Sequence, residues 1–263
     1  MSNANTTSPG MYPNALDQLQ LLRIVQDLHG LRRQREKAYD ELARAHRITL
    51  SKLALAAEYR DGDTGTHIVR LGALSGLLAR SLAKPESWCE DIEQAAPMHD
   101  IGKIGIPDEI LKKPGGLTAA EREIMETHAI IGAQILGNTD VPVLCMAAEI
   151  ALNHHEQWDG NGYPRRLKGE EIPEAARIVA VIDFIDALTM DRCYRKAFSD
   201  EEVLSLLWSS RGTRFEPRIV DAAIKGFQRL TALRDAINRV DFGHELDAAL
   251  GGLGRPGRLA PPN

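Results

Sequence analysis

One pattern constrains this chain more than any other: from Leu50 to about Leu230, apolar residues recur at helical spacing almost throughout. Leu and Ala together make up roughly a quarter of the 263 residues, whereas aromatic residues make up only 5%. Such a composition favours helices over strands. We therefore expect an all-α fold and exclude an all-β fold.

The segment before this helical region divides into two parts. Residues 1–14 are polar and contain two prolines and a glycine, so we expect a disordered tail. Residues 15–48 lack proline and space their apolar residues alternately by three and four, which predicts a helix with a heptad seam. Arg35 places a charge in that seam. Two interpretations stay open: a coiled coil that joins two copies of the chain, or a helix that folds back on its own domain.

The helical domain is expected over residues 49–235, and residues 236–263 should form a helix end followed by a flexible tail rich in glycine and proline. Two internal helices are predicted to begin with a capping box, one at Thr118 with Glu121 and one at Ser199 with Glu202. Pro173 suits the first turn of a helix over residues 175–190.

Histidines concentrate in the middle of the chain, on or beside segments that otherwise predict apolar helices. They are His67, His99, His128, His154 and His155. A single histidine on an apolar face is usually a core residue with a satisfied hydrogen bond. Five of them within one helical domain instead indicate a shared site.

Two aspartates lie in similarly apolar surroundings. Asp100 follows His99 directly and precedes an apolar run, and Asp183 lies within the nearly continuous apolar stretch 178–185. Burial of an ionised carboxylate is costly unless a cation offsets it. For Asp183 the alternative to a metal is a buried salt bridge, with Arg177 as the candidate partner.

Imidazole and carboxylate ligands without thiolates suit first-row divalent metals such as manganese, iron, nickel or zinc. Ligands from several helices converge in the core of a helical domain. The set is larger than one ion requires, which indicates two or three ions, and paired ions are suited to phosphoester displacement. The residues alone therefore predict a metal-dependent phosphohydrolase that acts on a small phosphoester.

Two motifs resemble a known family. The first is HDIGKIGIPD at 99–108, and the second is HHE at 154–156 followed by WDGNGYP at 158–164. With Asp183 and further matches they span about residues 50–230, and they are similar to the HD-GYP family of cyclic di-GMP phosphodiesterases. The resemblance implies an HD-domain helical bundle with additional C-terminal helices.

The resemblance also implies a ligand set for two or three divalent ions. Iron or manganese is expected first, and zinc, nickel and magnesium are alternatives. Members with three ions have a glutamate four positions before the first ligand histidine, where this chain has Asp63, so the number of ions stays open. The implied ligands are Asp63, His67, His99, Asp100, His128, His154, His155 and Asp183.

Catalytic and substrate-binding residues follow from the same resemblance. Asp100 is expected to bridge two ions, and Lys103 to lie near the reacting phosphate. Lys103 is four positions after His99, which places both on one face if the helix continues. The remaining substrate-binding residues implied by the resemblance are Gly162, Tyr163, Arg192 and Arg195. Arg195 replaces a lysine of the family, and arginine binds phosphate in a bidentate manner.

The expected activity is hydrolysis of cyclic di-GMP to linear pGpG, and in a second cut to GMP, by attack of a metal-bridging hydroxide. One alternative is a phosphodiesterase for another cyclic dinucleotide, such as cyclic GMP-AMP. The other is a catalytically weak regulatory module that binds a cyclic dinucleotide or a protein partner. A diguanylate cyclase or an upstream sensor is the kind of partner expected.

Composition bounds the remaining possibilities. The formal net charge of −5 argues against a protein that wraps polymeric nucleic acid. Three cysteines without a CxxC pair support neither a disulfide framework nor a zinc ribbon. The N-terminus lacks the basic start and apolar core of a signal peptide, and no stretch reaches the length of a membrane span. These features predict a cytoplasmic protein.

Overall fold

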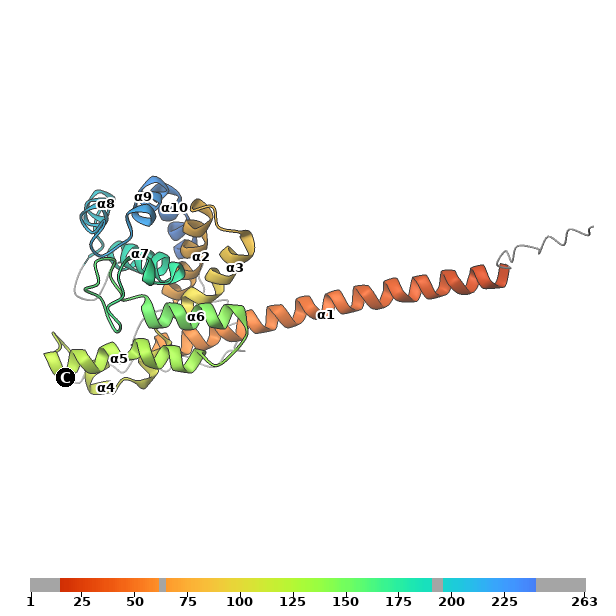
Figure 1. Cartoon of the computed structure of the whole chain (residues 1–263), viewed down its shortest axis with the longest axis horizontal. Coiled ribbons are helices and arrows are strands. Elements are labelled where there is room, and N and C mark those ends of the chain that lie inside the picture. Colours follow the sequence, from red (N-terminus) through yellow and green to blue (C-terminus); the bar gives the residue numbers. More distant parts are fainter. Residues whose placement is uncertain (1–14, 62–64, 191–195, 240–263) are drawn as a thin grey trace, which may run out of the picture. The chain divides into compact units, whose positions relative to one another are not determined.

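The computed structural model describes residues 15–61, 65–190 and 196–239, and these residues fold into helices joined by loops (Figure 1). No strand forms among them, although a single β-bridge links Arg211 to Phe215. The expected all-α fold is confirmed.

The helices follow one another in a simple order. They are α1 (Ala15–Asp61), α2 (Thr66–Ser81), α3 (Glu86–Ala95), α4 (Asp108–Leu111), α5 (Ala119–Leu136), α6 (Pro142–Asn153), α7 (Glu174–Thr189), α8 (Asp200–Ser209), α9 (Pro217–Lys225) and α10 (Phe227–Arg239). Three short 3₁₀ helices complete the set: η1 (Ala96–Met98), η2 (Ile101–Gly105) and η3 (Gly169–Glu171).

The chain divides into two compact units between Thr49 and Leu50. Helix α1 is not interrupted there, and it continues beyond the predicted end at residue 48 to Asp61. The physical reason lies in the spacing of Leu50, Ala54 and Ala57, which are buried and recur at helical intervals. The last turns of α1 therefore belong to the second unit.

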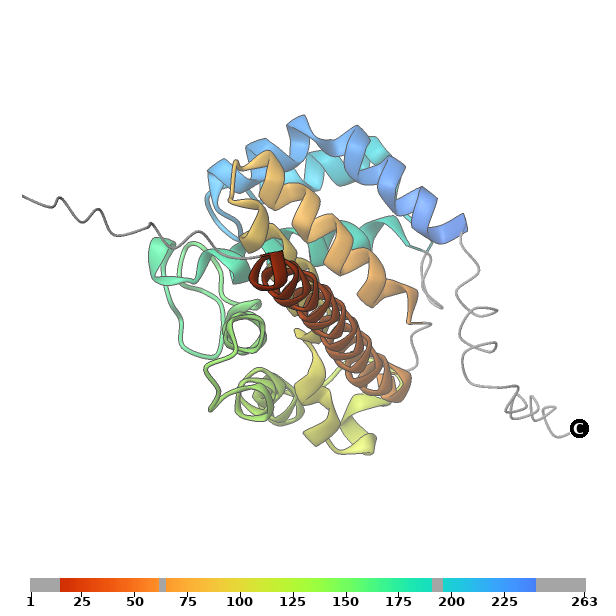
Figure 2. The same ribbon diagram turned by 90° about the vertical axis from the view of Figure 1, so that its right-hand side faces the viewer.

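The second unit has one hydrophobic core, in which α2 packs against α3, α7 and α10. Figure 2 shows α2 and α10 running side by side. Leu71, Leu74 and Leu78 of α2 are almost fully buried, as are Ile178 and Ile182 of α7. The first ligand-bearing helix of the predicted site is thus rigidly held by apolar packing.

The 3₁₀ helix η2 packs closely against α5, and Gly102 lies at the point of contact. A Cβ atom added at Gly102 would lie 1.9 Å from the carbonyl oxygen of His128 and 2.4 Å from the amide nitrogen of Gly132. Only a residue without a side chain permits this approach. The backbones that carry Asp100 and His128 therefore touch directly.

Both predicted capping boxes are present. The Thr118 hydroxyl accepts from the Glu121 amide at the start of α5, and Ser199 and Glu202 do the same at the start of α8. Pro173 differs slightly from the expectation, because it precedes the first turn of α7 as the N-terminal cap residue. Among the residues that the structure describes, no helix is long and apolar enough to cross a membrane.

Glu121 permits a test of how α5 is held. Its carboxylate pairs with Lys113 Nζ at 2.6 Å and accepts from the Thr118 amide at 2.8 Å, and these bonds lower its pKa from 4.5 to about 2. A carboxylate with a lowered folded-state pKa stabilises the fold above its unfolded pKa and loses this effect as the pH falls. We expect Glu121→Gln to lower the melting temperature near neutral pH.

The difference in melting temperature between Glu121→Gln and the wild-type protein should become smaller as the pH falls from about 4.5 toward 2. Thermal unfolding followed by circular dichroism at several pH values measures this difference. Glu123→Gln, on an exposed position of the same helix, serves as the control. A deficit of equal size at neutral and acidic pH would contradict the expectation.

Candidate metal centre

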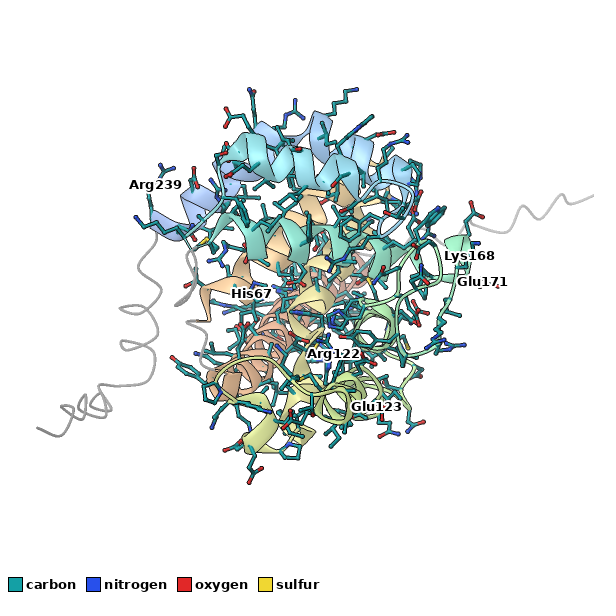
Figure 3. All side chains as sticks on the ribbon, turned by 90° about the vertical axis from the view of Figure 1, so that its left-hand side faces the viewer. His67, Arg122, Glu123, Lys168, Glu171 and Arg239 are labelled. Atoms are coloured by element: carbon teal, nitrogen blue, oxygen red, sulfur yellow. The ribbon has the colours of Figure 1, made fainter. Side chains whose placement is uncertain are left out.

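Six structural elements deliver the predicted ligands to the interior of the second unit. His67 lies in the first turn of α2, His128 in α5 and Asp183 in α7, while His99 and Asp100 join η1 to η2, and His154 and His155 end α6. Figure 3 shows His67 toward the middle of the unit, whereas the side chains of Lys168 and Arg239 lie at its periphery.

The first group of potential ligands is Asp100, His128, His154 and His155, whose ligating atoms lie within 4.8 Å of one another. The Oδ1 atom of Asp100 is 3.2 Å from His128 Nε2 and 3.6 Å from His154 Nε2. Both of these histidines are buried. Their Nδ1 atoms face backbone carbonyl oxygens of their own helices, so the Nε2 atoms face the group.

The second group is His67, His99 and Asp183, again with ligating atoms within 4.8 Å of one another. His67 Nε2 lies 3.8 Å from Asp183 Oδ1, and the rings of His67 and His99 meet edge to face at 5.5 Å. His99 Nε2 is 3.2 Å from Asp100 Oδ2. Asp100 therefore presents Oδ1 to the histidines of the first group and Oδ2 to His99 of the second group.

The buried polar atoms of this site fit a bound cation. Asp100 Oδ1, His128 Nε2 and His154 Nε2 are buried, and within the described part of the chain they have no hydrogen-bond partner of good geometry. Unsatisfied buried acceptors are costly. Imidazole and carboxylate groups that converge in this way are suitable ligands for a divalent metal.

The electrostatics of the site also favour bound cations. Burial opposes a charge on His67, yet the bond to Asp186 and the nearby Asp183 and Glu58 raise its pKa to about 9. Burial likewise opposes ionisation of Asp100, but Lys103 and His99 hold the pKa of Asp100 well below its usual range. Burial lowers the pKa values of His154 and His155. Each group contains one aspartate, and burial favours the neutral form of His154 and His155 in the first group.

Lys103 lies beside the shared carboxylate, with its Nζ 2.8 Å from Asp100 Oδ2. The expectation of a shared α-helical face with His99 is wrong, because the segment is a 3₁₀ helix that begins after Asp100. Three-residue periodicity instead aligns Lys103 with Asp100. Arg60 of α1 holds this segment, since it donates to the carbonyl oxygens of Lys103, Ile104 and Ile106.

The loop after α6 places Tyr163 at the rim of the first group, where its ring stacks on His155 with 4.6 Å between centroids. Gly162 is required for the turn, because a Cβ there would lie 2.3 Å from the Gln157 amide nitrogen. The buried Glu156 accepts from the amides of Arg165 at 2.7 Å and Leu167 at 3.0 Å. These bonds close the loop on itself.

Three of the predicted site residues, Asp63, Arg192 and Arg195, lie outside the described residues. The alternative salt bridge for Asp183 is wrong: Arg177 pairs instead with the buried Glu216. Asp183 is thus left facing His67.

Sequence reasoning missed several residues around His67. Asp186 and Arg70 are buried beside it, and a carboxylate oxygen of Glu58 lies 3.9 Å from its Nε2. A signal for Asp186 was present, since it is an aspartate three positions after Asp183 on an apolar helix and so shares its face. Arg70 and Glu58 carry no comparable signal, because their partners are distant in sequence.

Fold and site together define a class: an all-α domain with a centre of histidines and carboxylates in its interior. The sequence profile of the HD domain matches residues 50–219. The chain belongs to the HD domain family, which confirms the expected HD-domain bundle.

Curated relatives are similar over most of the second unit. A cyclic di-GMP phosphodiesterase response regulator of Xanthomonas campestris is 46% identical over 191 residues, which are 73% of this chain and 50% of the relative. A cyclic di-GMP phosphodiesterase of Thermotoga maritima is 47% identical over 182 residues, or 69% of this chain and 50% of the relative. The resemblance to HD-GYP phosphodiesterases is confirmed, and the chain spans about half the length of these relatives.

Two further relatives come from Vibrio cholerae. A 3′3′-cGAMP-specific phosphodiesterase 2 is 40% identical over 185 residues, covering 70% of this chain and 35% of that protein. The crystal structure of a cyclic GMP-AMP-specific phosphodiesterase aligns with a TM-score of 0.53 at 19% identity, covering 73% of this chain and 53% of the other. That structural similarity supports the fold.

Proposed function

We propose that this chain hydrolyses a 3′,5′-phosphodiester of cyclic di-GMP to yield linear pGpG, with a second cut to GMP. The observation that carries this proposal is the arrangement of two ligand groups around Asp100, whose two oxygens face different groups. Two ions close together suit in-line displacement at phosphorus. The names of the relatives at 46% and 47% identity support cyclic di-GMP as the substrate.

The residues proposed to hold the metals are the two groups described above, with Asp100 shared between them. We propose iron or manganese, because the ligands are imidazoles and carboxylates without thiolates. Zinc, nickel and magnesium are the alternatives. A third ion depends on Asp63, the remaining proposed ligand, and metal analysis of protein purified without oxygen distinguishes two ions from three.

Divalent ions bound in this centre supply positive charge to the phosphoryl oxygens and lower the pKa of a water molecule. The chain itself contributes Lys103, whose ammonium group lies 2.8 Å from Asp100 and is placed to stabilise charge on a phosphoryl oxygen. Gly162 and Tyr163 contribute the wall of the substrate site, and Tyr163 offers an aromatic face. Arg192 and Arg195 are proposed to bind phosphate.

The direct test is incubation of the metal-loaded full chain with cyclic di-GMP, followed by chromatography of the products. We expect pGpG to accumulate first. A fully metal-loaded protein that hydrolyses no cyclic dinucleotide would overturn the proposal and favour a regulatory binding module. Parallel reactions with 3′3′-cGAMP test the second candidate, which the 40% identical Vibrio cholerae relative favours. Faster hydrolysis of 3′3′-cGAMP would reassign the substrate.

Lys103→Met should separate chemistry from metal binding. We expect the turnover number to fall by about 10²–10³-fold, the effect of removing one group that stabilises transition-state charge. Metal content should stay unchanged, because the variant keeps both ligand groups. Steady-state kinetics with metal analysis measures both quantities, and Lys112→Met, on the exposed end of α4, is the control. Loss of metal from Lys103→Met would contradict this role.

We also propose that the N-terminal part of α1 joins two copies of the chain. Its apolar side chains Leu21, Ile24, Leu28 and Leu31 are exposed and recur at heptad spacing. Sedimentation of the full chain should show a dimer, and Leu28→Glu should shift it to the monomer. A compact wild-type monomer at micromolar concentration would contradict this proposal. The next partner to test for this helix would then be a diguanylate cyclase or an upstream sensor.

A further inference from the structure

The two ring nitrogens of His67 face different chemical environments. Nε2 points to the ligand group with Asp183, whereas Nδ1 donates to Asp186 Oδ2 at 2.7 Å. A hydrogen bond at Nδ1 leaves the lone pair on Nε2 and fixes the plane of the ring. The side chain of Asp186 is only 2% exposed, so this bond is shielded from water.

His67 differs in this respect from the histidines of the first group. The Nδ1 atom of His128 faces the carbonyl oxygen of Met125 at 2.7 Å, and that of His154 faces the carbonyl oxygens of Ile150 and Ala151. Those two rings are oriented by their own helices. His67 lies in the first turn of α2, and the partner of its Nδ1 atom is the side chain of Asp186 on α7.

Asp186 is itself held on both oxygens by one arginine. Arg70 Nε donates to Oδ1 at 2.6 Å, and Arg70 Nη2 donates to Oδ2 at 2.8 Å. Paired donors of this kind fix the plane of a carboxylate. Arg70 also donates from Nη1 to Asn238 Oδ1 of α10 at 3.1 Å. The chain of contacts thus runs from α10 through α2 and α7 back to the imidazole of His67.

The charge arrangement supports an orienting role. Asp186 faces Arg70 and His67, so its carboxylate has a cation on one side and an N–H donor on the other. Asp183, one turn earlier on α7, faces Nε2 of the same ring. The two aspartates lie on one face of α7. Asp183 faces Nε2, the proposed ligand atom of His67, and Asp186 is hydrogen-bonded to Nδ1 on the opposite side of the ring.

We propose that Asp186 and Arg70 are positioning residues that orient His67 for metal binding through Nε2. This inference rests on the proposed metal-dependent function and deepens it. A carboxylate behind a ligand histidine increases the basicity of the imidazole, and loss of such a partner commonly weakens metal binding by about 10–100-fold. Asn238 contributes by keeping Arg70 in place.

The test is a titration of the metal-free full chain with Co²⁺, followed by visible absorption. We expect Asp186→Asn to weaken one Co²⁺ site by about 10–100-fold and to change its absorption bands, while a second site of wild-type affinity remains. Arg70→Lys keeps the positive charge but removes the paired donors, and it should act in the same direction with a smaller effect. If Asp186→Asn fails to fold, the Co²⁺ affinity of Arg70→Lys tests the proposal instead.

Glu216→Gln is the matched control, because it disrupts another buried arginine–carboxylate pair, with Arg177, away from His67. It should lower stability without altering Co²⁺ affinity. Unchanged Co²⁺ affinity and absorption in folded Asp186→Asn or Arg70→Lys would overturn the inference and leave the proposed function standing. A wild-type chain that binds no Co²⁺, Mn²⁺ or Fe²⁺ would overturn both.

Discussion

Replacing Asp100 with alanine is expected to abolish hydrolysis of cyclic di-GMP, with a loss of at least about 10³-fold that reflects removal of a ligand shared by both metal groups. No other side chain in the described part of the site presents one oxygen to His99 and the other to His128 and His154. The variant should also bind fewer divalent ions. Kinetics with metal analysis of the purified protein checks both effects.

The control for Asp100→Ala is Asp221→Ala, which removes an exposed carboxylate that pairs with Arg211 on the surface. That variant should keep its metals and its activity. Retained hydrolysis by Asp100→Ala, at a rate near that of Asp221→Ala, would refute the assignment of the site. Fold retention is checked by circular dichroism, because removal of an aspartate from the centre changes the charge balance around Lys103.

Gly102→Ala is expected to have the largest effect on stability. Its new methyl group would lie 1.9 Å from the His128 carbonyl oxygen and 2.4 Å from the Gly132 amide nitrogen, and a backbone cannot yield as a side chain can. Overpacking of this kind costs about 3 kcal/mol. Separation of η2 from α5 should also separate Asp100 from His128, so metal affinity should fall together with the melting temperature.

Gly105→Ala, in the same 3₁₀ helix, provides the comparison. The three atoms nearest to its methyl group would all belong to the Ile131 side chain, the nearest at 2.9 Å, and that side chain can move. We expect a cost of about 1 kcal/mol or less. Chemical denaturation of both variants measures the difference. Equal stability of Gly102→Ala and Gly105→Ala would show that the contact between η2 and α5 is not rigid.

Much of the fold and of the candidate site could be predicted because the signals are local. The apolar periodicity predicted helices, and the capping residues predicted the starts of α5 and α8. The histidines and aspartates stood out because polar ligands on apolar helices require an explanation. The motif residues His99, Asp100 and His154 do lie together, although their role as ligands stays a prediction.

What could not be predicted depends on contacts between distant segments. Arg70 and Asp186 are 116 residues apart, and nothing local to either indicates their pairing. The sequence motif did not indicate that η2 is a 3₁₀ helix whose Gly102 lies against α5, so the relation of Lys103 to Asp100 required the tertiary structure. Likewise, Arg177 could not be assigned to Glu216 rather than Asp183 from sequence alone.

The bonds that Glu156 makes to the loop that follows it have a consequence for ligand affinity. A flexible loop loses conformational entropy when a ligand orders it, and that loss reduces the binding free energy. Because the Glu156 carboxylate holds the amides of Arg165 and Leu167, the loop that carries Tyr163 is ordered when the chain folds. A substrate that contacts Tyr163 therefore meets a loop that these two bonds already restrain, and ordering the loop takes less from the binding free energy than it would in an unrestrained loop.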